Sequence, residues 1–586
     1  MSRPFALRPT VRIAGHDAAA WQGWPDVARV LTEAAGRAQV VAVECYTGVF
    51  EDEVADRLGD ALGARVVRTA DALRSPAEVD ALVAPDLTDD SVFGRLSDLN
   101  LAEFFDPDRL GALRAEVDAA SGPVLVIGVG ATLVHPGDMV VYADLPRWEH
   151  QLRYRRDEAA NLGADNAGER WSLQYKRGYF VDWRVLDRHK RTRMDRWDVV
   201  LDTTRPGDPR LVTGTAYRDA IRQVARQPFS PVPFFDPGPW GGQWMREVCG
   251  LDARDEAEGR ERPPNYAWCF NAVPEENSLR LQFGEVVVET PSINVVFAEP
   301  DALLGADVRA RFGEEFPIRF DFLDTMGGGN LSLQVHPRAA YAREHFGLGY
   351  TQDESYYLMD ATPGAVVYLG LREDIDPEAM ARDLRAALDG DAPFPAEHYA
   401  ATWPVQTHDH VSIPAGTVHC SGAGSMVLEI SATPYLFTFK LWDWGRLGLD
   451  GRPRPIHIER GLATIAWDRT EAWTRANLVG RTEAVAEGDG WREERTGLDT
   501  SQFIETRRHW FTAPVPRDTE GTVHVLCLVE GEAALVESPE AAFAPFEVGY
   551  AEVAIVPASV GAYTVRPAAS GADPLGLLTA YVRPRA

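Results

Sequence analysis

Short runs of alternating apolar and polar residues are frequent in the later part of the chain. A clear example is Leu331-Ser-Leu-Gln-Val-His-Pro337, and short apolar runs such as Val523-His-Val-Leu-Cys-Leu-Val529 follow much later. Alternation with a period of two is typical of β-strands that bury one face. The pattern therefore predicts a mainly β region.

The first part of the chain has a different pattern. Unbroken apolar runs at Val40-Val-Ala-Val43 and Val124-Leu-Val-Ile127 alternate with segments of helical periodicity. Such runs between helices are typical of a parallel sheet that is covered on both faces. We predict a separate α/β domain over residues 1–225.

One helix is expected inside the β region. Between Glu373 and Asp389, apolar residues recur at helical spacing and acidic residues stand near the start. The apolar positions are Ile375, Met380, Leu384 and Leu388. The pattern predicts an amphipathic helical insertion near residues 373–390 that covers the β structure.

Composition limits the range of partners. The chain has 586 residues, more than one hydrophobic core can hold, and a formal net charge of -29. Such an acidic chain disfavours nucleic acid and anionic membranes as general partners. Its five cysteines are an odd number without C-x-x-C spacing, which argues against a disulfide framework. No signal-peptide pattern or membrane-length apolar run is present, so we expect a cytoplasmic protein.

A basic island interrupts this acidic chain at residues 147–196, where thirteen Lys or Arg stand against eight Asp or Glu. It includes Lys176 and Lys190, with Trp171 and Tyr179 among them. One interpretation is a site for an anionic ligand. The other is a solvated helical face that pairs with the acidic body of the protein.

Four residues are candidate metal ligands. Gln334 and His336 lie two positions apart on a predicted strand, so their side chains share a face. Glu354 begins a second apolar run, and a Pro-Ala-Gly turn at 414–416 directs His419 inward. Each residue alone has an ordinary structural explanation, but two imidazoles, a carboxylate and an amide together suit a borderline divalent ion. We predict zinc, or another divalent metal, with one or two coordination positions open for water or substrate.

These residues also carry a resemblance to a known family, the type I mannose-6-phosphate isomerases. Members are zinc-dependent cupins whose ligands are Gln-x-His, Glu and a later His. The resemblance extends over about residues 226–586. It includes Pro233-Phe-Phe-Asp-Pro-Gly-Pro-Trp-Gly-Gly242, Phe316-Pro-Ile-Arg-Phe-Asp-Phe-Leu-Asp324 and Trp442-Asp-Trp-Gly-Arg446.

The resemblance implies two cupin barrels, over 226–500 and 501–586. In the second, Pro557-Ala-Ser-Val-Gly-Ala562 parallels the turn before His419 but ends in alanine, so we expect no metal there. His408 and His410 form another H-x-H pair in a polar stretch. We interpret them as surface histidines.

The resemblance further implies aldose–ketose isomerisation through an enediol, most simply between mannose 6-phosphate and fructose 6-phosphate. Glu429 and Lys440 are the predicted catalytic residues, with a metal-bound water as a third candidate base. Lys440 is one of only three lysines among 59 basic residues. Lysine has a pKa that its surroundings can tune, which arginine lacks.

Ser332, Gln352 and Arg446 are the predicted substrate-binding residues. Gln352 stands where many family members carry a lysine that meets the sugar phosphate, and Lys440 stands where relatives carry an arginine. The substrate is therefore a sugar or a sugar phosphate. The alternatives are an isomerase acting on a different or unphosphorylated sugar and a non-catalytic metallo-cupin that senses sugar.

The α/β domain weakly resembles a P-loop nucleoside kinase. Its first strand leads into Val41-Ala-Val-Glu-Cys-Tyr-Thr-Gly-Val-Phe-Glu51, where a phosphate loop would follow. A working loop needs G-x-x-x-x-G-K-[ST], but Glu44, Val49, Phe50 and Glu51 occupy required positions. Two acids would repel a triphosphate. We therefore predict a degenerate phosphate loop with a structural or regulatory role.

Overall fold

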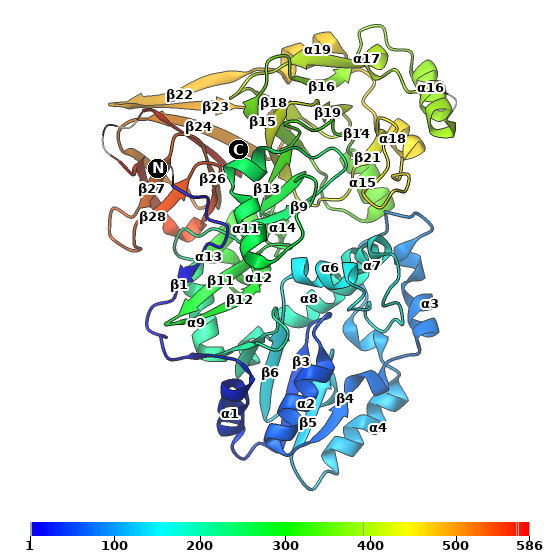
Figure 1. The fold of residues 1–586 in the computed structure, drawn as a ribbon, viewed down its shortest axis with the longest axis vertical. Helices are drawn as coiled ribbons and strands as arrows, with labels where there is room; N and C mark the ends of the chain where they lie inside the picture. Colours follow the sequence, from blue (N-terminus) through cyan, green and yellow to red (C-terminus); the bar gives the residue numbers. More distant parts are fainter. Residues whose placement is uncertain (1–2, 391, 570, 572, 585–586) are drawn as a thin grey trace. The chain divides into compact units, whose positions relative to one another are not determined.

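The computed structural model describes residues 3–390, 392–569, 571 and 573–584, and it shows a multidomain protein (Figure 1). The chain forms two compact units. Unit 1 holds the described residues of Met1–Pro9, Arg226–Val273 and Pro300–Ala586, and unit 2 holds Thr10–Ala225 and Pro274–Glu299. Residues 274–299, which we placed in the domain 226–500 by sequence, thus belong to unit 2.

Unit 2 is built on a seven-stranded sheet in the order β2-β8-β7-β6-β3-β5-β4. The run from β7 to β4 is parallel, β8 pairs antiparallel with β7, and β2 pairs antiparallel with β8. Every residue of β3, β5, β6 and β7 is buried, as expected for parallel strands with both faces covered. The strands are β2 (Ala20–Gln22), β3 (Val40–Cys45), β4 (Arg65–Arg68), β5 (Val124–Gly128), β6 (Met139–Asp144), β7 (Val199–Asp202) and β8 (Arg210–Thr213).

The inserted segment pairs with the start of unit 2. Strands β11 (Ser278–Phe283) and β12 (Val286–Pro291) form a hairpin, and β1 (Val11–Arg12) lies parallel to β11. Helix α12 (Ile293–Ala298) follows the hairpin, and its Asn294 reaches the carboxylate of Asp144 at 3.1 Å. Buried polar contacts of this kind hold the insertion to the α/β sheet.

The basic island lies on three helices of unit 2, α6 (Arg147–Arg155), α7 (Trp171–Arg177) and α8 (Trp183–Arg191). Much of its charge is used inside the unit. The Nζ of Lys190 lies 2.9 Å from the Asp144 carboxylate, and the Nζ of Lys176 donates to the carbonyl of Asp90. Both lysines are buried. An anionic ligand at this island remains a prediction.

Unit 1 begins with two antiparallel sheets. One has the order β18-β15-β20-β13-β10-β9 and the other β17-β16-β19-β14-β21. The strands of the first are β9 (Phe234–Asp236), β10 (Trp268–Ala272), β13 (Ile318–Asp324), β15 (Glu354–Ala361), β18 (His410–Ile413) and β20 (Ser425–Ala432). Those of the second are β14 (Leu333–Val335), β16 (Val366–Leu371), β17 (Ala400–Pro404), β19 (His419–Ser421) and β21 (Phe439–Trp442).

A second pair of antiparallel sheets ends the chain, in the orders β22-β23-β24-β31-β26-β29 and β25-β30-β27-β28. Both sheets contribute to one apolar core that includes Leu526, Val536 and Leu577. The strands are β22 (Thr482–Gly488), β23 (Trp491–Thr496), β24 (Ile504–Phe511), β25 (Val515–Asp518), β26 (His524–Glu530), β27 (Ala533–Glu537), β28 (Phe546–Gly549), β29 (Val553–Val556), β30 (Ala562–Pro567) and β31 (Leu575–Val582). The six-stranded sheet therefore takes in strands that precede residue 501.

Helix α16 (Pro377–Asp389) lies between β16 and β17 in the chain. Its N-cap is Asp376, whose carboxylate accepts from the backbone N–H groups of Glu378 and Ala379, and Gly390 ends it in the left-handed conformation. Within the described ranges, no helix combines the length and apolarity needed to cross a membrane.

Candidate metal centre

Three strands of unit 1 bring the predicted ligands together. Gln334 lies in β14 directly opposite His419, the first residue of β19, and His336 comes just after β14. Glu354 opens β15 in the facing sheet. The site therefore lies between the two sheets, where side chains from both converge.

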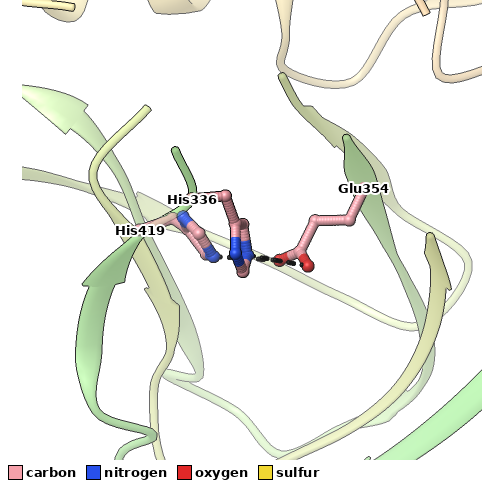
Figure 2. Close-up of side chains that lie close together, drawn as sticks. All are labelled: His336, Glu354 and His419. Carbon is pink, nitrogen blue, oxygen red and sulfur yellow. Dashed lines mark ion pairs between the residues drawn. The ribbon is translucent and has the colours of Figure 1, made fainter. Parts of the chain in front are cut away.

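The side chains of His336, Glu354 and His419 point toward one another (Figure 2). The Nε2 of His336 lies 2.9 Å from Oε2 of Glu354, and the Nε2 of His419 lies 2.9 Å from Oε1. The amide nitrogen of Gln334 lies 3.2 Å from the Nε2 of His419. All four predicted metal ligands are buried, so water is largely excluded.

Backbone carbonyls fix both imidazoles. The Nδ1 of His336 lies 3.2 Å from the carbonyl oxygen of Phe437, and the Nδ1 of His419 lies 2.9 Å from that of Thr417. A ring that donates through Nδ1 presents a free Nε2 lone pair, the arrangement usual for metal-ligating histidines. Gln352 donates to Oε2 of Glu354 at 3.0 Å and thereby orients the carboxylate.

The donor atoms fit a divalent ion. One nitrogen or oxygen from each of His336, Glu354 and His419 lies within 4.8 Å of the others. The buried Nε2 of His336 and Oε1 of Glu354 make no hydrogen bond of good geometry within the described chain. Both atoms lie 2.9 Å from an oppositely charged group of the cluster, and a buried polar atom whose hydrogen bonding is incomplete is often completed by a water or an ion. Two imidazoles and a carboxylate are a common ligand set for catalytic zinc.

Electrostatics agrees with a carboxylate that stays ionised. Burial by itself would raise the pKa of Glu354, but the neighbouring His336 and His419 lower it well below its usual range. Burial opposes the charge of His336, but Glu354 raises the pKa of that imidazole. The buried charges are thus matched within the cluster.

Glu429 lies in β20, opposite Tyr356 of β15 and Asp321 of β13. Its Oε1 accepts a hydrogen bond from Arg319 at 2.7 Å, and Arg319 also lies 2.6 Å from Asp321. Burial, together with the charge of Glu354, raises the pKa of Glu429 to about 8 against the opposing effect of Arg319. A buried polar row therefore lies on the same face of the sheet as Glu354.

Lys440 lies in β21, opposite Gln334 of β14. Directly opposed residues of an antiparallel pair point to the same side of the sheet, so Lys440 projects from the same face as Gln334. Burial lowers the pKa of its ammonium group to about 7, and the charge of Arg454 adds to this effect. Lys440 is therefore a titratable group beside the centre.

The other two predicted substrate residues meet at Asp443. The hydroxyl of Ser332 donates to Oδ1 of Asp443 at 3.0 Å, and Arg446 donates to the same oxygen at 2.7 Å. Arg454 donates to Oδ2 at 2.6 Å. Asp443 thus accepts hydrogen bonds from two guanidinium groups and one hydroxyl, directly after the end of β21, the strand that contains Lys440.

Comparison with known proteins places the chain in a family. The mannose-6-phosphate isomerase of Streptococcus mutans is 30% identical over 239 residues, which are 40% of this chain and 67% of that relative. The chain belongs to the mannose-6-phosphate isomerase family. The mannose-6-phosphate isomerase ManA of Bacillus subtilis is 27% identical over 153 residues, 26% of this chain and 45% of that protein. The chain thus spans about two thirds of the first relative and less than half of the second.

Two further similarities concern domains and solved structures. Residues 23–226 match the family model of a domain of unknown function (DUF8485). The crystal structure of the mannose 6-phosphate isomerase from Bacillus subtilis is 17% identical with a TM-score of 0.46, and covers 61% of this chain and 100% of that one. A mutant structure of phosphomannose isomerase from Salmonella typhimurium is 15% identical with a TM-score of 0.45, at 61% and 100% coverage.

Sequence reasoning missed Arg319, Asp321 and Tyr356 in this member of the mannose-6-phosphate isomerase family. The first two alternate with Phe320 and Phe322, so a signal existed: charged residues at every second position of an apolar strand. Alternation of this kind usually indicates an exposed face, whereas every residue of β13 is buried. Only the opposed strand β20, with Glu429, explains why charge is tolerated there.

The interpretation of His408 and His410 as surface histidines was wrong for His410. It begins β18, is buried, and its Nδ1 lies 2.8 Å from the hydroxyl of Thr496. Burial lowers the pKa of His410 to about 3, so the ring is neutral. His408 is half-buried and lies 3.1 Å from Glu530. A strand that starts inside a polar stretch left no apolar signal in the sequence.

Proposed function

We propose that this protein is a metal-dependent sugar isomerase that interconverts mannose 6-phosphate and fructose 6-phosphate through an enediol. The observation that carries the proposal is the buried convergence of His336, Glu354 and His419 in a chain of this family. The ligand atoms come from the sheet that contains β14 and β19 and from the facing sheet that contains β15, so the site forms only when these two sheets fold together.

Gln334, His336, Glu354 and His419 would hold zinc or another divalent ion. When bound, such an ion polarises a sugar carbonyl and offsets the negative charge that develops as the neighbouring C–H is deprotonated. The carbonyls of Phe437 and Thr417 would support metal binding, because they orient the imidazoles of His336 and His419. Burial of the ligands keeps bulk water from the reacting carbons.

Isomerisation also needs a group that moves a proton between C1 and C2. We assign this role to Lys440, because its lowered pKa of about 7 allows it to accept and return a proton near neutral pH. Glu429 is the second candidate, but its carboxylate is engaged by Arg319 at 2.7 Å. Replacing Lys440 by methionine and Glu429 by glutamine separates the two. Proton exchange at C2 is lost in the variant that removes the base.

The substrate contacts are proposed at Ser332, Gln352 and Arg446. Gln352 adjoins the ligand Glu354, and Ser332 and Arg446 adjoin each other at Asp443. Arg446 then supplies positive charge for a sugar phosphate, because Gln352 stands where many family members carry a lysine.

A second candidate function keeps the reaction and changes the substrate to an unphosphorylated sugar. The specific observation in its favour is Gln352, a buried neutral amide where many family members carry a cation. A neutral side chain removes the electrostatic reason for a phosphate at that point.

The two substrates are tested side by side with metal-loaded protein. Conversion of mannose 6-phosphate to fructose 6-phosphate is followed by NMR, in parallel with conversion of free mannose to fructose. Turnover of the phosphosugar alone supports the main proposal, and turnover of the free sugar alone supports the second. Binding of either sugar without any turnover would instead indicate a sensor.

A further inference from the structure

Unit 2 contains a cavity of about 210 Å³ that the isomerase site does not use. Its walls come from the loops after β3, β4 and β5 and from residues 158–163, which follow α6. The three strands are neighbours and parallel, so their carboxyl ends meet at one edge of the sheet. In open α/β sheets, ligands bind at this edge, near the strand where the chain order reverses. Here β3 is that strand, because β5 and β6 lie on its two sides.

The lining is acidic and apolar. Among the described residues that form it, the charged ones are Glu51 and Glu158, and none is basic. Glu158 is exposed and held by Arg156 at 2.8 Å, which leaves Glu51 as the acid inside the cavity. Val49, Phe50, Leu73 and Val129 provide apolar walls. A phosphate or carboxylate ligand would meet repulsion rather than a counter-charge.

The chain's own carboxylates take the positions that an anion would need. Glu44 accepts hydrogen bonds from the backbone N–H groups of Gly130 and Thr132 at 2.6 and 2.8 Å. The first turn of α2 (Glu51–Leu62) contains three acids, Glu51, Asp52 and Glu53. The carboxylates in this part of unit 2 would therefore repel a nucleotide phosphate, although ligands of open α/β sheets usually bind at this edge.

Glu51 and two threonines form a polar corner of the cavity. The Oε1 of Glu51 accepts a long hydrogen bond of 3.3 Å from the N–H of Val129, and Thr47 and Thr69 also line the space. A Cβ on Gly128, where φ is +128°, would lie 2.2 Å from the Thr69 hydroxyl and 3.0 Å from Oε2 of Glu51. Glycine at this position thus lets the carboxyl and the hydroxyl lie side by side.

The aromatic wall is fixed as well. The guanidinium carbon of the buried Arg153 lies 4.1 Å from the centre of the Phe50 ring, and Arg153 also donates to the carbonyl of Gly48 at 2.6 Å. Gly48 has a φ of +89°, and a Cβ there would lie 2.5 Å from the His150 ring. These contacts hold the loop between β3 and α2, which carries Phe50 and leads into Glu51.

We propose that this cavity binds an uncharged polyhydroxyl compound the size of one sugar ring, with a ligand hydroxyl donating to Glu51 and an apolar ring face against Phe50. The volume is below the roughly 300–1,000 Å³ of sites for drug-sized ligands and is several times the ~30 Å³ of a water molecule. Burial raises the pKa of Glu51 to about 7, so the carboxyl suits a neutral hydroxyl better than it suits a cation. Thr47 and Thr69 can each donate and accept.

The test uses the full-length protein and D-mannose as the probe, a choice that rests on the proposed function. Binding is measured by isothermal titration calorimetry on the His336→Ala variant, so that the isomerase site does not contribute. In that background, Ala70→Trp places a large side chain at an exposed residue that lines the cavity, so that it fills the space. The matched control is Ala112→Trp, on the exposed face of α4 (Pro107–Asp118), which does not line the cavity. Glu51→Gln keeps the size of the side chain and removes its charge.

The proposal predicts saturable binding that Ala70→Trp abolishes, Ala112→Trp leaves unchanged and Glu51→Gln weakens about 10-fold or more. It is overturned if neither D-mannose, D-fructose nor D-glucose binds, or if Ala70→Trp and Glu51→Gln bind like the parent. Binding of ATP or putrescine that depends on Glu51 would also overturn it, since the ligand would then be charged. None of these results depends on isomerase turnover, which His336→Ala removes, so a failure here is distinct from a failure of the isomerase proposal.

Discussion

At the scale of single residues, Glu354 determines the character of the centre. It is fully buried, it lies 2.9 Å from each of two imidazoles, and it accepts a hydrogen bond from Gln352. A buried carboxylate is costly unless its partners are complete. Removing one partner therefore changes both the orientation of the carboxylate and the affinity of the site for a cation.

Gln352→Leu is expected to weaken metal binding by about 10- to 100-fold, because outer hydrogen bonds fix the orientation of metal ligands. Zinc affinity is measured by competition with a chromophoric chelator. Gln406→Leu, at an exposed position outside the site, serves as the control and is expected to bind zinc like the wild type. Equal affinities for the two variants would show that Gln352 has no positioning role.

Lys440 gives a pH-dependent stability. Its folded-state pKa of about 7 lies below the ~10.4 of an unfolded lysine, so the unfolded chain binds a proton that the folded chain lacks between these values. The free energy of unfolding therefore gains a contribution as pH rises from about 7 toward 10, and that contribution is absent below pH 7. Lys440→Met is expected to lose this rise relative to the wild type. Parallel stability curves from urea unfolding at several pH values would contradict the lowered pKa.

At the scale of elements, α16 shows how closely an amphipathic pattern determines packing. Met380 and Leu384 are buried, as the helical spacing predicts, but Leu388 is 57% exposed and Ala387 is buried instead. The helix ends at Asp389, and its last turn no longer follows the apolar face. The spacing of the apolar residues predicts the helix and most of its buried face, but it does not show that Leu388 in the last turn is exposed.

Leu384→Ala is expected to destabilise the protein by about 2–5 kcal/mol, the usual cost of a cavity at a buried leucine. The matched change Leu388→Ala is expected to stay within about 0.5 kcal/mol, because that side chain is already in water. Urea unfolding of both variants provides the measurement. A similar loss of stability in each would show that Leu388 is covered in solution.

The sequence patterns predict where strands lie, but they do not show which strands pair with each other. Alternation in residues 331–337 predicts a common face for Gln334 and His336, and the structure places both beside His419 or Glu354. Glu429 and Arg319 are 110 residues apart in the chain, and their contact depends on the register of β13 and β20. No local pattern encodes such a register, so the polar row beside the centre required the structure.

At the scale of the whole molecule, each of the two units is built from segments that are separated in the sequence. The hairpin of β11 and β12 lies in sequence among strands of unit 1, but its residues bond within unit 2, as Thr290 does to Tyr217 at 2.8 Å. Alternation in a hairpin is the same in either unit, so no pattern along the chain indicates to which unit the hairpin belongs. The predicted metal ligands, in contrast, all lie in unit 1.

Zinc is expected to stabilise the protein against unfolding, because the four ligands converge only in the folded state. Once the site is saturated, each further tenfold increase in free zinc adds about 1.4 kcal/mol to the free energy of unfolding of the part of the chain that holds the site. Thermal unfolding with and without a chelator tests this, and His336→Ala is expected to lose most of the response. Equal shifts in both proteins would place the stabilising ion elsewhere.

The most direct test measures bound zinc and conversion of mannose 6-phosphate to fructose 6-phosphate on the same samples of wild type, His336→Ala and His398→Ala. His398 is an exposed histidine of α17 (Ala396–Tyr399) outside the centre, so its variant controls for loss of any imidazole. We predict turnover and about one zinc per chain in the wild type and His398→Ala, and loss of both in His336→Ala. Turnover that persists in His336→Ala after its zinc is lost would contradict the account.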